Sequence, residues 1–165
     1  MSRFLIKQRV FSWTDTYYVY DEAGNPILFI KADWLSLGHR IRVFDNSTGE
    51  EIGIIQEKIF RIFKEFEISI NGYSQGIIKQ RFSIFRPVYD IDYRGWHLEG
   101  DFMEWNYDIF EGDRMVVRIN KELFRWGDTY VIDVYYPEDD LPAIMIAIAM
   151  DAAKCSSDEQ RNTFW

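Results

Sequence analysis

The run Leu141–Met150 constrains this chain more than any other stretch, because all ten of its residues are apolar. Asp140 precedes it and Pro142 lies inside it, and an aspartate followed by a proline in the first turn is typical of a helix N-terminus. Such a helix has no polar face to turn to water, so it must be surrounded. A membrane span needs about 20 apolar residues. We therefore expect the helix Asp140–Lys154 to be enclosed by protein.

Composition indicates what could enclose it. The chain has 165 residues, of which 47% are hydrophobic and 18% aromatic, and this favours a β-rich globular fold. The single cysteine, Cys155, excludes an internal disulfide framework, and the charged start Met1–Arg9 does not resemble a secretory signal. We expect one domain over residues 1–165, with 156–165 as a polar tail, in a cytoplasmic protein without a transmembrane span. A monomer is favoured.

The net charge of −8 argues against a general nucleic-acid binder. The charge is unevenly placed, because residues 1–100 hold 13 basic and 13 acidic side chains while residues 101–165 hold 6 and 14. The excess of acidic residues is therefore confined to the C-terminal part.

Internal repeats give the number of strands. The segments Val10–Val19 and Leu123–Ile132 share an apolar-Phe-x-Trp-x-Asp-Thr-Tyr pattern, and weaker copies lie between them. We interpret this signature as a turn-and-packing motif. The anchors of the copies are spaced by 20 to 25 residues, enough for two strands each, and they are Phe11, Leu35, Phe60, Phe82, Phe102 and Phe124. Six hairpin-like units predict about twelve strands.

The strands alternate between apolar and polar residues, as Ile41 and Val43 do with Arg40 and Arg42. Each therefore has one buried face. A closed barrel of about twelve strands has a lumen too wide for its own side chains to fill, since about eight strands already give a filled interior. We predict a mainly β fold: a closed antiparallel barrel of about twelve strands around the central hydrophobic C-terminal helix.

Three segments resemble a known family. They are Phe4–Trp13, Trp34–Gly38 and the apolar C-terminal helix, and they are similar to those of bacterial members of the LURP-one-related family, which share the Tubby C-terminal-like fold. The resemblance covers essentially the whole chain and implies a twelve-stranded barrel around a hydrophobic helix. Relatives by fold include Tubby proteins, which bind phosphoinositides through basic surface residues, and phospholipid scramblases. Neither site maps onto this sequence residue by residue, so the resemblance implies a fold and leaves the role unassigned.

No stretch of the sequence is typical of an active site. His39 and His97 stand without the spacing of a metal site, and Cys155 has no base beside it. We interpret the acidic run Glu138–Asp140 as a helix cap, although a cation site is an alternative. The other carboxylates, for example Asp90, Asp92, Asp101, Asp108, Glu111 and Asp113, lack the spacing of a calcium loop. We expect a non-catalytic binding or scaffold protein with no cofactor and no metal.

One electrostatic feature favours a ligand. Residues 58–86 carry six positive charges against two negative ones, with phenylalanines between them, and two arginines lie on the preceding hairpin. The alternative function is therefore binding of an anionic lipid or a phosphorylated small molecule, at the periphery of a membrane. The candidate ligand-binding residues are Arg40, Arg42, Lys58, Arg61, Lys79 and Arg81. A competing interpretation is that these side chains simply point outward for solubility.

Overall fold

The computed structural model describes residues 1–7, 16–35, 38–84, 88–124 and 127–163, with the backbone alone for 34–35, 127–128 and 155–163. Within these ranges the fold is one antiparallel sheet of twelve strands, in the order β8-β7-β6-β5-β4-β3-β2-β1-β12-β11-β10-β9. The strands are β1 (Ser2–Lys7), β2 (Thr16–Asp21), β3 (Pro26–Leu35), β4 (Gly38–Asp45), β5 (Glu51–Glu57), β6 (Glu65–Ile70), β7 (Tyr73–Arg81), β8 (Val88–Asp92), β9 (Trp96–Asp101), β10 (Asn106–Glu111), β11 (Arg114–Phe124) and β12 (Gly127–Val134). Two short 3-10 turns, η1 (Phe102–Glu104) and η2 (Pro137–Asp139), precede β10 and the helix.

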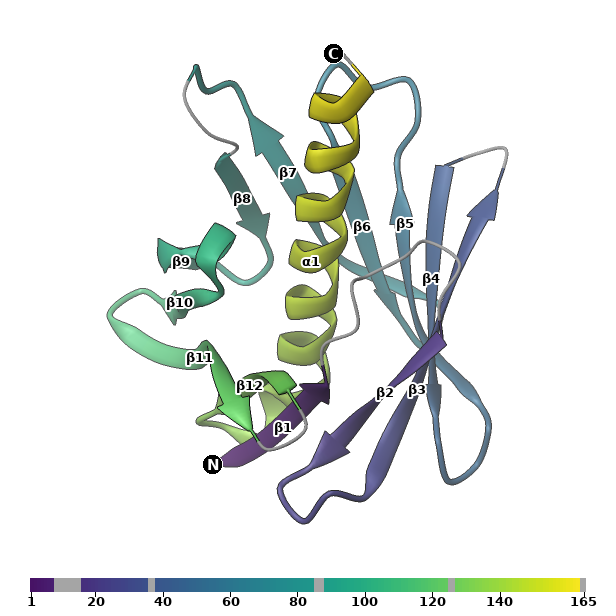
Figure 1. Cartoon of the computed structure of the whole chain (residues 1–165), viewed down its shortest axis with the longest axis vertical. Coiled ribbons are helices and arrows are strands. Elements are labelled where there is room, and N and C mark those ends of the chain that lie inside the picture. The colour runs from purple at the N-terminus through teal and green to yellow at the C-terminus, as the bar shows by residue number, and fades with distance from the viewer. Residues whose placement is uncertain (8–15, 36–37, 85–87, 125–126, 164–165) are drawn as a thin grey trace.

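The helix α1 (Asp140–Thr163) runs through the middle of the curved sheet, as Figure 1 shows. Every side chain in Ala143–Met150 is buried, and the largest, such as Ile146 and Ile148, contact the inward faces of the strands. Burial of each large apolar side chain contributes about 1.5–3 kcal/mol. The predicted twelve-stranded, mainly β barrel around a hydrophobic C-terminal helix is thus confirmed.

The helix begins at Asp140, as expected, but it continues to Thr163 instead of ending at Lys154. Glutamate, glutamine and arginine beyond Lys154 are good helix formers. A helix that is already nucleated by its buried part therefore extends through most of the polar tail.

The barrel is nearly closed, because one pair of neighbouring strands does not form a ladder. Strands β8 and β9 follow one another in the chain, yet they lie at the two ends of the hydrogen-bonded order. They meet at the tight turn 93–95, where Trp96 N donates to Tyr93 O over 2.8 Å, and diverge beyond it. We call this interval between β8 and β9 the seam.

The five described repeat anchors lie in or directly before the connections at one end of the barrel, with Leu35 and Phe124 as the last residues of β3 and β11. Phe60 falls between β5 and β6, Phe82 between β7 and β8, and Phe102 in η1. Phe11 and most of the N-terminal signature, as well as Trp126, lie outside the described residues, so the interpretation of that signature stays a prediction.

Candidate functional site

The barrel end that holds the C-terminal part of α1 has exposed apolar side chains. Successive turns of an antiparallel meander alternate between two ends, so the β5–β6 and β7–β8 connections lie at the same end (Figure 1). Four large side chains project from them into solvent and form what we call the apolar rim: Phe60 (97% exposed), Ile62 (95%), Phe82 (75%) and Ile84 (79%).

Phe60 is the most unusual residue of the rim. Its φ is +60°, a left-handed conformation that residues with side chains seldom adopt. Neighbouring Phe63 packs edge to face on Phe82, with ring centroids 6.5 Å apart, and this contact joins the two connections. The rim is therefore one continuous surface built from two turns, and its exposure is not explained by packing within the barrel.

Basic side chains flank the rim. Four of the six sequence-predicted ligand-binding residues lie here: Lys58 and Arg61 in the β5–β6 connection, and Lys79 and Arg81 at the end of β7. Each is at least one-third exposed, and each forms an ion pair with a neighbouring carboxylate. The pairs are Lys58 with Glu67, Arg61 with Glu65 (3.4 Å), Lys79 with Glu65 (3.2 Å) and Arg81 with Asp90 (2.6 Å).

The two remaining predicted residues do not join this group in the same way. Arg40 lies on β4 and donates to Gln56 over 2.8 Å, beside the β5–β6 connection. Arg42 lies further along β4, pairs with Glu51 and stacks over the ring of Phe44. The structure therefore places Arg42 on the outer wall, away from the rim.

A buried charged cluster supports the β5–β6 connection from below. Glu57 accepts from His39 Nδ1, from the His39 backbone N–H and from Lys64 Nζ. Burial alone would raise the pKa of Glu57, but the hydrogen bonds from His39 and Lys64 lower it to about 2. His39 is thus a buried hydrogen-bond partner of a carboxylate whose ionised form is favoured.

Two carboxylates of the acidic run before the helix contact other parts of the chain. Asp139 is fully buried and accepts from Arg94 over 2.9 Å, while Ser2 donates to Asp140 over 2.9 Å. The interpretation of Glu138–Asp140 as a helix cap stays a prediction, and the carboxylate of Asp139 in addition holds the β8–β9 turn through Arg94.

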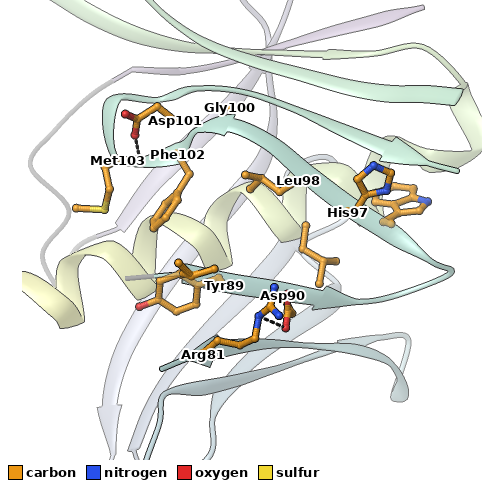
Figure 2. Close-up of a pocket in the computed structure, with 12 residues that line it drawn as sticks. Arg81, Tyr89, Asp90, His97, Leu98, Gly100, Asp101, Phe102 and Met103 are labelled. Carbon is orange, nitrogen blue, oxygen red and sulfur yellow. Dashed lines mark hydrogen bonds and ion pairs between the residues drawn. The ribbon is translucent and has the colours of Figure 1, made fainter. Parts of the chain in front are cut away.

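A second concave feature opens at the seam. A cavity of about 400 Å³ lies between β8 and β9, and Figure 2 shows its lining. Apolar side chains, including Tyr89, Leu98 and Phe102, form its floor, and Arg81 bound to Asp90 lies at its edge. Its size falls within the range of about 300–1,000 Å³ that is common for ligand pockets.

Titratable side chains near the seam already contact other groups of the protein. His97 stacks on Phe110 and lies 3.4 Å from Glu99, while Asp101 accepts from the backbone of η1. Within the described ranges, no three His, Cys, Asp or Glu side chains gather closely enough to hold a metal ion. Over the same ranges, no helix has both the length and the apolarity that a membrane crossing requires.

Sequence reasoning found only part of the rim. The phenylalanines between the basic residues are visible in the sequence, but nothing there marks Ile62 and Ile84 as exposed. The signal it lacked was position, since both isoleucines fall in connections between strands instead of on an alternating strand face. It also omitted Lys64, which is bound to Glu57.

Comparisons with known proteins give matches over most of the chain. The model of the family described as LURP-one-related matches residues 2–151. The uncharacterised protein YxjI of Bacillus subtilis is 25% identical over 160 residues, which cover 97% of this chain and 98% of that protein. An Arabidopsis thaliana protein known from an X-ray structure is similar in fold, with a TM-score of 0.60 and 15% identity over 92% of this chain and 90% of that one.

Proposed function

The chain belongs to the LURP-one-related family, and from this premise we propose that it is a non-catalytic module that docks on an anionic membrane surface through the apolar rim and the basic residues beside it. The observation that carries the proposal is the exposure of four large apolar side chains on two adjacent connections, next to Lys58, Arg61, Lys79 and Arg81. Apolar side chains at the tip and cations around them are the two contributions that hold a protein at a lipid interface.

The side chains of the apolar rim insert into the membrane interface. An exposed apolar side chain gains free energy when it leaves water, by about 25 cal/mol for each Å² that is covered. Phe60 and Ile62 are almost fully exposed, so nearly their whole surface is available for this transfer. The left-handed backbone at Phe60 holds an aromatic ring outward at a conformational cost, and such a cost is typical of positions that serve binding.

The basic residues beside the rim give the preference for anionic lipid. The stretch from Lys58 to Ile84 has five cations, including Lys64, against two carboxylates, Glu65 and Glu67, on a protein whose net charge is −8. Each basic residue near an anionic surface contributes about 1 kcal/mol, and salt weakens this attraction. The existing ion pairs do not oppose it strongly, because pairs of exposed groups are worth only about 0–1 kcal/mol and can exchange a carboxylate for a phosphate.

Vesicle co-sedimentation tests the proposal. The full chain should sediment with vesicles of phosphatidylcholine and phosphatidylserine at low salt and much less at high salt. Replacement of Arg61, Lys79 and Arg81 by glutamine removes three cations and should weaken binding about a hundredfold. Phe60→Ser together with Ile62→Ser should weaken it independently, because that variant keeps every charge.

Matched controls come from the rest of the molecule. Tyr73 is 75% exposed at the start of β7, at the opposite end of the barrel, so Tyr73→Ser should bind as the parent does. Arg42→Gln removes a cation from the outer wall and should also bind normally. If the rim variants bind as well as these controls, or if the parent does not sediment at low salt, the proposal is wrong.

A further inference from the structure

The seam has two unpaired strand edges that face each other. Among the described residues, β8 is hydrogen-bonded only to β7 and β9 only to β10, so within that part of the chain the outer edge of each presents backbone N–H and C=O groups without a ladder partner. Exposed edges of this kind are templates for another strand. The cavity of about 400 Å³ between them provides room for side chains beneath an added backbone.

The side chains along the seam alternate between apolar and acidic. Tyr89 and Ile91 on β8, with Trp96 and Leu98 on β9, line the cavity on the inner side. The residues between them, which point outward by the strand period, are mostly carboxylates. They are Val88, Asp90 and Asp92 on β8 and His97, Glu99 and Asp101 on β9, of which Val88, Asp90, His97 and Asp101 also border the cavity, and neither strand contains a lysine or an arginine.

Trp96 forms part of the wall between the cavity and the core. Its side chain is 2% exposed, lines the cavity and packs edge to face on Tyr93, with ring centroids 4.8 Å apart. Aromatic packing therefore holds this part of the cavity wall.

We propose that the seam binds an extended segment of another polypeptide, which adds as a strand along β8 or β9 and carries alternating apolar and basic side chains. The backbone of the segment pairs with an open edge. Its apolar side chains enter the cavity over Leu98 and Phe102. Its basic side chains point outward, where Asp92 and Glu99 flank them.

The charge of the seam selects this occupant. Asp90 is already neutralised by Arg81 at 2.6 Å, whereas Asp92 and Glu99 are exposed and, where the structure describes the chain, no lysine or arginine is paired with them. Opposite charges on directly neighbouring strands stabilise a pair, and like charges destabilise it. An acidic strand would therefore be repelled on both sides, and a basic one attracted.

Fluorescence anisotropy with designed probes tests this inference. The first probe is a fluorescein-labelled heptapeptide of alternating lysine and valine, and the second replaces each lysine by glutamate. A third has the lysines and valines in two blocks, and a fourth has N-methylated backbone amides that cannot donate. We expect the first to bind at least about tenfold more tightly than each of the others, because only it has the pattern, the charge and the donors.

Variants locate the binding. Asp92→Lys combined with Glu99→Lys should reverse the preference, so that the glutamate peptide binds more tightly than the lysine peptide. The control of equal charge change is Glu22→Lys combined with Glu50→Lys, both exposed in the β2–β3 and β4–β5 connections away from the seam, and it should keep the parent's preference. Amide hydrogen exchange should show the lysine peptide protecting residues 88–92 or 96–101.

Several outcomes would overturn the inference. Equal binding of the block peptide would show that charge alone is responsible. Unchanged preference in the Asp92→Lys, Glu99→Lys variant, or protection elsewhere in the chain, would place the peptide at another surface. Protection of the same amides by self-association, without peptide, would show that a second copy occupies the seam.

Discussion

Arg94 donates from Nη1 to Oδ1 of Asp139 over 2.9 Å, and this contact ties the turn between β8 and β9 to the residue immediately before the helix. Asp139 is fully buried, whereas the side chain of Arg94 is about half exposed. Arg94 reaches it from a left-handed backbone, with φ of +48°. The ion pair between Arg94 and Asp139 thus holds the β8–β9 turn, where the seam begins, next to the start of the helix.

Loss of this contact should destabilise the fold. Arg94→Gln leaves the Asp139 carboxylate buried with only Arg114 nearby, at 3.9 Å, so we expect the free energy of unfolding to fall by about 3 kcal/mol. Urea denaturation measures the change. Arg118→Gln breaks the exposed pair with Asp108 and should cost less than about 1 kcal/mol. Adding Asp139→Asn to Arg94→Gln should recover part of the loss, and an equal effect of the two arginine variants would contradict the argument.

The buried face of α1 should dominate stability. Ile148→Ala creates a cavity against the strands and should lower the free energy of unfolding by about 2–5 kcal/mol. Ile62→Ala removes the same atoms from a side chain that is 95% exposed, so it should change stability by no more than about 0.5 kcal/mol. Thermal and urea denaturation of the two variants provide the comparison. Similar losses would show that Ile62 is packed in solution.

Removal of the whole helix should abolish folding. A chain that ends after Pro137 exposes the inward faces of all twelve strands, which the helix otherwise covers. We expect this truncated chain to aggregate or to lack a cooperative transition. Near-ultraviolet circular dichroism and gel filtration measure both properties. A soluble truncated protein that unfolds cooperatively would mean that the helix does not fill the barrel.

Asp151 should make stability depend on pH. Burial raises the pKa of Asp151 to about 7, and Lys154 opposes the shift. Because the folded pKa lies above the unfolded value of about 3.9, the contribution to stability is full below pH 4 and is lost as pH rises through 7. Asp151→Asn should match the parent near pH 4 and exceed it by about 1–3 kcal/mol at pH 8. Urea denaturation at both pH values tests this, and an equal gain at pH 4 would contradict it.

Close packing of β7 on β8 should be sensitive to one added methyl group. A Cβ at Gly76 would lie 2.3 Å from the carbonyl oxygen of Asp92. Backbone must move to admit it, so Gly76→Ala should cost about 1–3 kcal/mol and speed hydrogen exchange of the β8 amides. The neighbouring substitution Gln75→Ala should be nearly neutral. Unchanged exchange in β8 after Gly76→Ala would show that the strand absorbs the change elsewhere.

The main elements of this fold were predictable because their signals are local. An apolar run without a polar face requires enclosure, and the alternation around Ile41 and Val43 requires a sheet with one buried face. The inward burial of both residues and the path of α1 agree with these arguments. Such signals depend only on residues close together in the sequence, so they can be recognised without knowledge of tertiary contacts.

The seam and the apolar rim depend on non-local geometry instead. Val88–Asp92, a short turn and Trp96–Asp101 have the sequence of an ordinary hairpin, and nothing in it shows that the two strands diverge. Phe60 and Ile62 have the residue types of a packing motif, and only the placement of their connection exposes them. Likewise, the carboxylates that pair with Lys58 and Lys79 come from strand β6, a pairing that the register decides.

The position of β1 in the sheet also determines the order in which the molecule can be built during translation. Strands β1 to β7 each pair with the strand that the ribosome releases next, and so do β9 to β11, so two meanders can form as the chain emerges. The remaining ladder joins β1 to β12, with Ser2 opposite Val134, and it waits for almost the whole chain to be synthesised. The helix follows all twelve strands in the sequence. Each nascent chain therefore holds an open, unfilled sheet until the helix is released, and exposed apolar strand faces of this kind favour aggregation.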